Sequence, residues 1–243
     1  MALVMNKFSP ENCPRDYLNQ NMMGPNVLRL VEELSRSLEL WPGMRILDLG
    51  CGTGLSSMYL ATEFGVEVVA ADLWVNADDN ARRFASASME NKIMPINLDI
   101  SASPGLGIFA RDAFDAVVSI NAWHYFGTDR SFIDQCIAPY IKDGGMVAVI
   151  IPGLRTQNAE ALPEMRSLID SGVNLLTTDR WRSVWSKSQY LTISQCRHMT
   201  SGRQAWLEWQ KCENVFAAAD TAWGDEETGK QLRFIQMIGH VIK

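Results

Sequence analysis

The chain has 243 residues, 47% of them hydrophobic, which is enough for one α/β domain with a sizeable core. Its 22 basic and 28 acidic residues give a net charge of −6, and no run of Lys or Arg is long enough to follow a phosphate backbone, which argues against a nucleic-acid partner. There is no basic segment followed by an apolar core at the start, and no apolar run approaches the roughly 20 residues of a membrane helix. We therefore expect a cytoplasmic protein with no membrane partner.

Cysteine usage gives no sign of a metal or a redox site. The five cysteines are odd in number and widely scattered, and no C-x-x-C pair occurs. We expect no bound metal.

The N-terminal segment predicts a cap followed by a helix. Residues 15–24 contain Tyr17, Met22 and other apolar side chains that do not suit a free tail, so this segment is expected to fold over part of the molecule. Pro25 suits a first helical turn, and an apolar stripe over residues 27–38 predicts the helix itself.

The most informative stretch is MRILDLGCGTG, residues 44–54. Residues 45–49 have the length and composition of a buried strand, and three glycines then follow at every second position, at 50, 52 and 54. Glycine permits positive φ and carries no Cβ, so a ligand is able to lie against the main chain there. Apolar residues at helical spacing over 55–65 predict a helix whose free N–H groups point back at that ligand.

Dinucleotides and S-adenosylmethionine are the two ligand classes that use such a strand, turn and helix. The dinucleotide fingerprint is G-x-G-x-x-G, whereas this chain has G-x-G-x-G with Asp48 two residues before the first glycine. The stretch LDLGCGTG resembles motif I of the class I S-adenosylmethionine-dependent methyltransferases. The resemblance implies that Asp48 orients the methionine ammonium of the donor and that Gly50, Cys51, Gly52 and Gly54 pass under it.

Further strands and helices alternate along the next hundred residues. Apolar runs predict strands at 66–72, 92–100, 114–120 and 146–153, and helical spacing covers residues 78–89 between the first two of them. Residues 132–141 are also expected to be helical. Parallel strands joined in this way place their carboxyl ends on one edge of the sheet, beside the glycine turn.

Two acids at strand ends complete the donor site that the resemblance implies. Asp72 corresponds to the acid that binds the ribose hydroxyls, and Leu73 packs on the adenine face. Asp99 is expected to accept the adenine amino group, and Ile100 to cover the ring.

The loop after the fourth strand, residues 121–127, is where we expect the chemistry. Asn121, His124 and Tyr125 are the candidate catalytic residues, and Asn121 also faces the cofactor. A histidine with a pKa near 6.5 suits removal of a proton from the acceptor, although a lone histidine is often structural, and both readings stay open. The loop lacks the sequence N-P-P-Y, which argues against methylation of adenine in nucleic acid.

The remainder of the chain is less regular. It predicts a lid or linker helix at 155–180, a short helix at 179–190 and a sixth strand at 193–199. A long helix at 203–223 and a seventh strand at 231–243 follow.

Six tryptophans follow the fourth strand, at positions 123, 181, 185, 206, 209 and 223. They form either a cage for a cationic methylammonium group or ordinary core, and the core reading is favoured. Among residues that contact the substrate we count Tyr17, Met22, Trp123, His124 and Trp185.

The resulting fold prediction is a doubly wound α/β domain with a seven-stranded, mostly parallel sheet and an N-terminal cap segment. We divide the single domain into a cap and helix (1–43), a donor-binding core (44–153) and lid or acceptor elements with the last strands (154–243).

The resemblance extends to uncharacterised bacterial methyltransferases that act on small molecules. It implies S-adenosylmethionine-dependent transfer of a methyl group to an N, O or S atom of a small-molecule acceptor, by direct in-line displacement. A monomer or homodimer is expected. A donor-binding regulatory or sensor protein without turnover and a lipid-modifying cyclopropane synthase-like enzyme stay open as alternatives.

Overall fold

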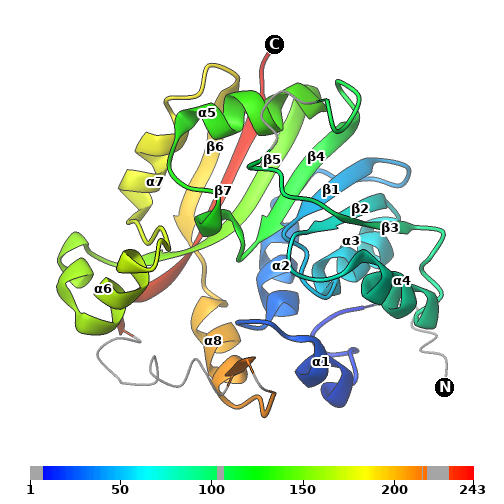
Figure 1. The fold of residues 1–243 in the computed structure, drawn as a ribbon, viewed down its shortest axis with the longest axis horizontal. Helices are drawn as coiled ribbons and strands as arrows, with labels where there is room; N and C mark the ends of the chain where they lie inside the picture. The colour runs from blue at the N-terminus through cyan, green and yellow to red at the C-terminus, as the bar shows by residue number, and fades with distance from the viewer. Residues whose placement is uncertain (1–7, 103–106, 215, 218–229) are drawn as a thin grey trace.

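The computed structural model describes residues 8–102, 107–214, 216–217 and 230–243 of the chain. Within them lies a seven-stranded sheet of order β3-β2-β1-β4-β5-β7-β6 (Figure 1). The strands are β1 Arg45–Leu49, β2 Glu67–Asp72, β3 Ile93–Asn97, β4 Phe114–Ile120, β5 Ile141–Leu154, β6 Leu191–His198 and β7 Leu232–Val241. The first five strands pair in parallel, and β7 runs antiparallel to both of its neighbours. The predicted mostly parallel sheet is confirmed.

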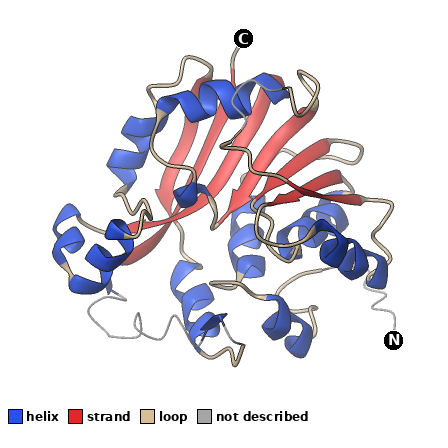
Figure 2. Cartoon of the chain, in the orientation of Figure 1, coloured by secondary structure: helices blue, strands red, loops and turns tan. Residues whose placement is uncertain are grey.

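Helices cover both faces of this sheet (Figure 2). The α-helices are α1 Arg15–Asn21, α2 Val27–Ser35, α3 Leu55–Phe64, α4 Ala77–Ser86, α5 Arg130–Phe132, α6 Pro163–Asp170, α7 Thr178–Trp185 and α8 Gly202–Gln210. Shorter helical turns are η1 Trp123–Tyr125, η2 Ile133–Ile137, η3 Ala138–Tyr140 and η4 Gln157–Ala161. Among the helices described, none combines the length and the apolar character that crossing a bilayer requires.

The alternation of side chains along β1 explains why both faces are covered. Successive side chains of a strand point to opposite faces. Ile46 packs in a cluster with helices α2 and α3, whereas Leu47 and Leu49 pack in a second cluster with α7 and the turns η2 and η3. Because each face has its own apolar cluster, the predicted doubly wound arrangement is confirmed.

Two of the expected helices are shorter or less regular than predicted. The segment expected to be helical over 132–141 is α5 followed by a π turn and a 3-10 turn, because Pro139 has no N–H to continue an α-helix. The long helix expected over 203–223 ends at Gln210. Beyond it, Asn214 donates from its side chain to the carbonyls of Asn19 and Met22, which ties the chain to the cap segment. Residues 215 and 218–223 of that expectation, with Trp223, lie outside the described residues.

The other boundaries also shift. Strand β5 begins at Ile141 rather than at residue 146, with a register irregularity opposite Phe114 and Ala116 of β4. In place of one lid or linker helix over 155–180, the chain forms η4 and then α6.

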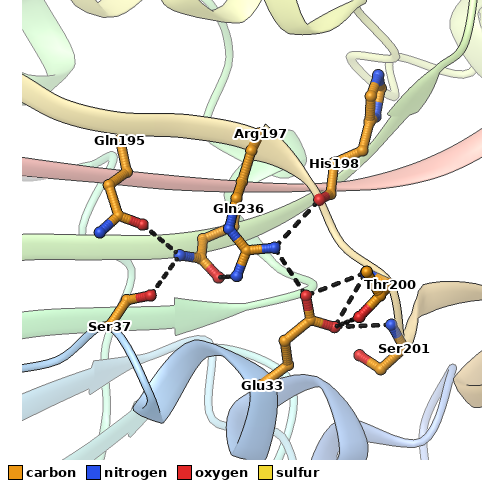
Figure 3. A network of polar contacts seen from close by, with 8 residues as sticks. All are labelled: Glu33, Ser37, Gln195, Arg197, His198, Thr200, Ser201 and Gln236. Atoms are coloured by element: carbon orange, nitrogen blue, oxygen red, sulfur yellow. Dashed lines mark hydrogen bonds and ion pairs between the residues drawn. The ribbon is translucent and has the colours of Figure 1, made fainter.

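A buried carboxylate joins α2 to the C-terminal part of the sheet (Figure 3). Glu33 accepts hydrogen bonds from Arg197 Nη1 at 2.7 Å and from the backbone N–H groups of Thr200 at 3.0 Å and Ser201 at 2.7 Å. Burial raises the pKa of Glu33, but these hydrogen bonds together outweigh burial and lower the pKa to about 2. The network fixes the start of α8, and α8 packs against α2.

Replacing Glu33 with glutamine is expected to lower the free energy of unfolding by about 3 kcal/mol at pH 7, since the folded pKa lies roughly two units below an unfolded value of about 4.3. This stabilisation is present above the unfolded pKa and is lost as the pH falls through the folded one. Urea unfolding at pH 7 and at pH 3 should therefore show a smaller difference between wild type and Glu33→Gln at pH 3. Glu32→Gln, one position earlier on α2, is the control, and an unchanged Glu33→Gln difference at the two pH values would contradict the charge argument.

Candidate active site at the carboxyl ends of the strands

A cavity of about 430 Å³ opens at the carboxyl ends of the parallel strands. Its wall comes from five segments, contributed by residues within 21–27, 49–56, 71–74, 98–101 and 120–126. Four of these segments follow β1, β2, β3 and β4, where ligands bind in open α/β sheets. The fifth is the end of α1 and the chain that leads into α2, so the N-terminal segment does fold over the cavity as expected.

Packing partly explains why the turn after β1 contains glycine. Gly50 and Gly54 have φ of +73° and +85°. A Cβ on Gly50 would lie 2.3 Å from Cβ of Ala122, and one on Gly54 would lie 2.4 Å from the ring of Phe84. The wall includes Gly50 but not Gly54. The expectation that Gly54 contacts the ligand is therefore not supported, because its open side is filled by Phe84.

Asp48 lies one layer behind the wall rather than on it. Its side chain is fully buried, and Oδ2 accepts hydrogen bonds of 2.6 Å from Ser56 and from Ser57 at the start of α3. Its Oδ1 has no hydrogen-bond partner among the described residues. Burial, helped by nearby Asp72 and partly offset by the two serines, raises the pKa of Asp48 to about 6. Ser56, which bonds this carboxylate, does line the cavity.

Asp72 joins the end of β2 to the glycine turn. Its Oδ2 accepts the Gly52 N–H at 2.7 Å, and its Oδ1 accepts the N–H groups of Trp74 and Val75 at 2.8 and 2.9 Å. A carboxylate has about four acceptor positions, so these three bonds leave one for a ligand hydroxyl. Asp72 and Cys51 both line the cavity.

The residues expected around an adenine ring lie together on the next part of the wall. Leu73 is exposed, Ile100 is buried, and Asp99 is exposed with Oδ1 accepting the N–H groups of Ser101 and Ala102. Leu73, Asp99 and Ile100 line the cavity together.

The loop after β4 contributes two of its expected residues to the wall. Asn121 sits at φ +57°, and its N–H bonds the carbonyl of Ile150 at 2.8 Å, which fixes the loop as it leaves the sheet. Tyr125 is exposed on the cavity and meets Trp74 edge to face, with ring centroids 4.9 Å apart. The opposite cap segment contributes Met22 to the same cavity.

His124 is not part of the cavity wall, although its ring centroid lies 4.0 Å from that of Tyr125, which is. The side chain of His124 is buried, and Nδ1 has no partner among the described residues. Burial lowers the pKa of His124 to about 3, which leaves a neutral ring and a weak base at neutral pH. Its carbonyl accepts the side-chain amide of Asn174 at 2.9 Å. The structure therefore does not support a general base at His124 and favours a positioning role in the loop.

The expected aromatic substrate contacts are core contacts instead. Trp123 and Trp185 are buried on the sheet with ring centroids 5.3 Å apart, and neither lines the cavity. Trp181 and Trp209 are also fully buried. Tyr17 packs on Phe8 and donates towards Sδ of Met58 at 3.7 Å, away from the wall. These tryptophans fill core, which is the reading that the sequence favoured.

Two residues that sequence reasoning missed support the turn from α4. Asn80 donates from Nδ2 to the carbonyl of Gly52 at 2.8 Å, and Arg83 donates to the side-chain oxygens of Asn80 at 2.9 Å and Asn21 at 3.1 Å. A link thus runs from the cap segment through α4 to the glycine turn. The spacing of 80, 83, 84 and 87, which places these residues on one helix face, was the available signal.

Comparison with known proteins agrees with this geometry. Residues 46–145 match a family model described as a methyltransferase domain. The chain is 28% identical over 120 residues to a ubiquinone biosynthesis O-methyltransferase of Nitrobacter winogradskyi, a match that covers 49% of this chain and 43% of that protein. It is 39% identical over 133 residues to phosphoethanolamine N-methyltransferase 1 of Arabidopsis thaliana, covering 54% of this chain and 25% of that protein.

Solved structures resemble the whole fold. Phosphoethanolamine N-methyltransferase 2 of Haemonchus contortus superposes with a TM-score of 0.75 at 15% identity, over 96% of this chain and 59% of that one. At this identity the likeness shows the fold alone. The chain spans less than two thirds of the length of each of these three relatives.

Proposed function

We propose that the chain is a class I S-adenosylmethionine-dependent methyltransferase and that it transfers a methyl group from S-adenosylmethionine to a small-molecule acceptor. The observation that carries the proposal is the cavity, whose wall joins the glycine turn after β1 to acids after β2 and β3 under a cap from the N-terminal segment. On this proposal residues 1–43 are the cap and leading helix, 44–153 hold the donor, and 154–243 complete the fold.

The residues present fit this donor. The charged side chains among the described wall residues are Asp72 and Asp99, and buried Asp48 has an unpartnered oxygen behind the wall. Carboxylates without a competing cation suit a donor that carries a sulfonium and an ammonium group. Asp72 has an acceptor position left for a ribose hydroxyl, and Leu73 and Ile100 offer apolar surface to the adenine.

The other half of the cavity is assigned to the acceptor. It is formed by residues within 21–27 and 120–126, and Tyr125 is the one ionisable side chain among the wall residues of these two segments. The donor supplies an electrophilic methyl group. When bound there, the donor would offer its methyl carbon to a lone pair of the acceptor, and the chain would contribute positioning and exclusion of water.

The test is to incubate the protein with donor labelled in its methyl group and a fractionated cell extract. We expect label in small molecules of the aqueous or organic extract, and none in RNA, membrane phospholipid or protein. A separate titration measures donor binding. Donor that binds while no fraction gains label would overturn the transferase proposal in favour of a sensor, and donor that does not bind would overturn the site itself.

Replacing His124 with glutamine is expected to lower kcat by less than about tenfold, because a buried neutral ring outside the cavity does not transfer protons to the acceptor. A general base at this position would instead contribute roughly 10²–10⁴-fold. The measurement is kcat/KM from pH 5 to 9 with the acceptor found by labelling, and His240→Gln on β7 is the control. A loss above 10²-fold at unchanged donor affinity would restore the base assignment.

A further inference from the structure

The acceptor half of the cavity is apolar. Its side chains include Met22, Met23, Val27, Ile120, Tyr125 and Phe126. Besides the Tyr125 hydroxyl, the polar side chains of this half are the amides of Asn21 and Asn121, and the Asn21 amide already donates to Tyr17 and accepts from Arg83. A ligand in this half therefore meets mostly carbon.

No Lys, Arg or His belongs to the described wall on either side of the cavity. Among the segments outside the description, 103–106, 215 and 218–229 contain no Lys or Arg in their sequence, and 1–7 contains one Lys, at position 7. The charged groups that do line the cavity, Asp72 and Asp99, are both acids. Proteins recognise phosphate and carboxylate groups with Arg, Lys or free backbone N–H groups, and like charges are disfavoured in such a site.

Two features near the wall, Arg83 and the N-terminus of α2, are of the kind that attracts anions. Arg83 lies behind Asn21 and spends Nε on Asn21 and Nη1 on Asn80. Helix α2 begins beside the wall, and the side-chain oxygen of its N-cap residue Asn26 accepts a hydrogen bond from the Leu28 N–H at 3.1 Å. Neither Arg83 nor Asn26 is part of the described cavity wall.

We propose that the acceptor is an uncharged, largely apolar molecule that carries no phosphate or carboxylate group. This inference rests on the proposed function, since it concerns the second half of the same cavity. It separates this chain from the relatives whose names specify a phosphorylated acceptor, because no cation belongs to the described part of the wall that would meet the phosphate.

The test compares three probes that share a 4-hexylphenyl group: 4-hexylphenol, 4-hexylphenyl phosphate and 4-hexylbenzylammonium. Calorimetry first measures binding of S-adenosylhomocysteine alone, and absence of this binding would contradict the proposed function rather than the present inference. With S-adenosylhomocysteine saturating, we expect the phenol to bind at least about tenfold more tightly than the phosphate and the ammonium probe. Equal or tighter binding of either charged probe, or no binding of the phenol while S-adenosylhomocysteine binds, would overturn the inference.

A pair of variants tests the absence of a cation directly. Met23 lines the acceptor half, whereas Met94 on the edge strand β3 is exposed outside the cavity. Met23→Arg is expected to improve phosphate-probe affinity at least about tenfold over wild type, and Met94→Arg, with the same change in net charge, is expected to leave it unchanged. Equal effects of the two variants would overturn the inference, and the wild-type probe ranking decides alone if Met23→Arg does not bind S-adenosylhomocysteine.

Discussion

Replacing Gly50 with alanine is expected to lower the free energy of unfolding by about 2–5 kcal/mol and to abolish measurable donor binding. The new Cβ would lie 2.3 Å from Cβ of Ala122, a contact that no rotamer change relieves because alanine has none. Overpacking of this kind costs about 1–3 kcal/mol, and a non-glycine residue at φ +73° adds about 1–2 kcal/mol. The loop after β4 would be pushed from the turn, and both belong to the cavity wall.

The double variant Gly50→Ala/Ala122→Gly separates these two costs. Removing the Ala122 methyl group relieves the overlap and leaves the backbone strain, so about 1–3 kcal/mol should return in urea unfolding. Gly127→Ala is the matched control for strain alone, since Gly127 has φ +87° and an added Cβ would meet no atom within 4 Å. If the double variant were no more stable than Gly50→Ala, contact with Ala122 would not be the reason for glycine at position 50.

The sheet could be predicted from the sequence because its central strands are buried on both faces. Such strands appear as continuous apolar runs, and β4 at Phe114–Ile120 has the boundaries that its run predicted. Helix ends were less predictable, since they depend on contacts far away in the chain. The side chain of Asn214, after α8, donates to the carbonyls of Asn19 and Met22, and no local sequence pattern predicts this contact.

The donor side of the site followed from topology. Parallel strands bring their carboxyl ends together, so Asp72 and Asp99 lie on one wall although 27 positions separate them. Asp48 shows the limit of that reasoning, because the motif predicts an acid at the site and says nothing of its depth. The serines of α3 hold it behind the wall.

The loop after β4 could not be resolved from sequence. The tripeptide Trp123, His124 and Tyr125 forms a single 3-10 turn, which sends neighbouring side chains in different directions. The first two residues are buried and Tyr125 faces the cavity. Which of these side chains reaches the ligand depends on how the turn packs against α7 and Asn174. Both lie more than 45 residues later in the chain.

Replacing Asp48 with asparagine is expected to have opposite effects on stability and on donor binding. In the free protein the buried carboxylate has a pKa of about 6 against an unfolded value of about 3.9, so keeping it charged at pH 7 costs about 3 kcal/mol. An amide of the same shape removes that cost. We therefore expect the free energy of unfolding of the variant, measured in urea, to be about 1–3 kcal/mol higher than that of the wild type. Donor affinity should fall at least about tenfold, because the negative charge next to the cationic donor is lost.

The dependence on pH distinguishes this charge effect from a change in packing. Because the folded pKa is raised, the folded state binds more protons than the unfolded state between about pH 4 and pH 6, and wild-type stability falls as the pH rises through that window. Asp48→Asn should lack this slope. Donor binding should show the reverse trend, since a cation beside Asp48 lowers its pKa again, so wild-type affinity rises from pH 5 to pH 7 while the affinity of the variant stays flat.

Ser57→Ala serves as the control for shape. It removes one of the two hydrogen bonds to Asp48 and keeps the charge, and Ser57, unlike Ser56, is not part of the cavity wall. Loss of this bond should raise the pKa of Asp48 further and move the pH dependence of donor affinity upward without removing it. A stability gain in Asp48→Asn that persists unchanged at pH 4, where the wild-type carboxyl is protonated, would show that repacking and not charge is responsible.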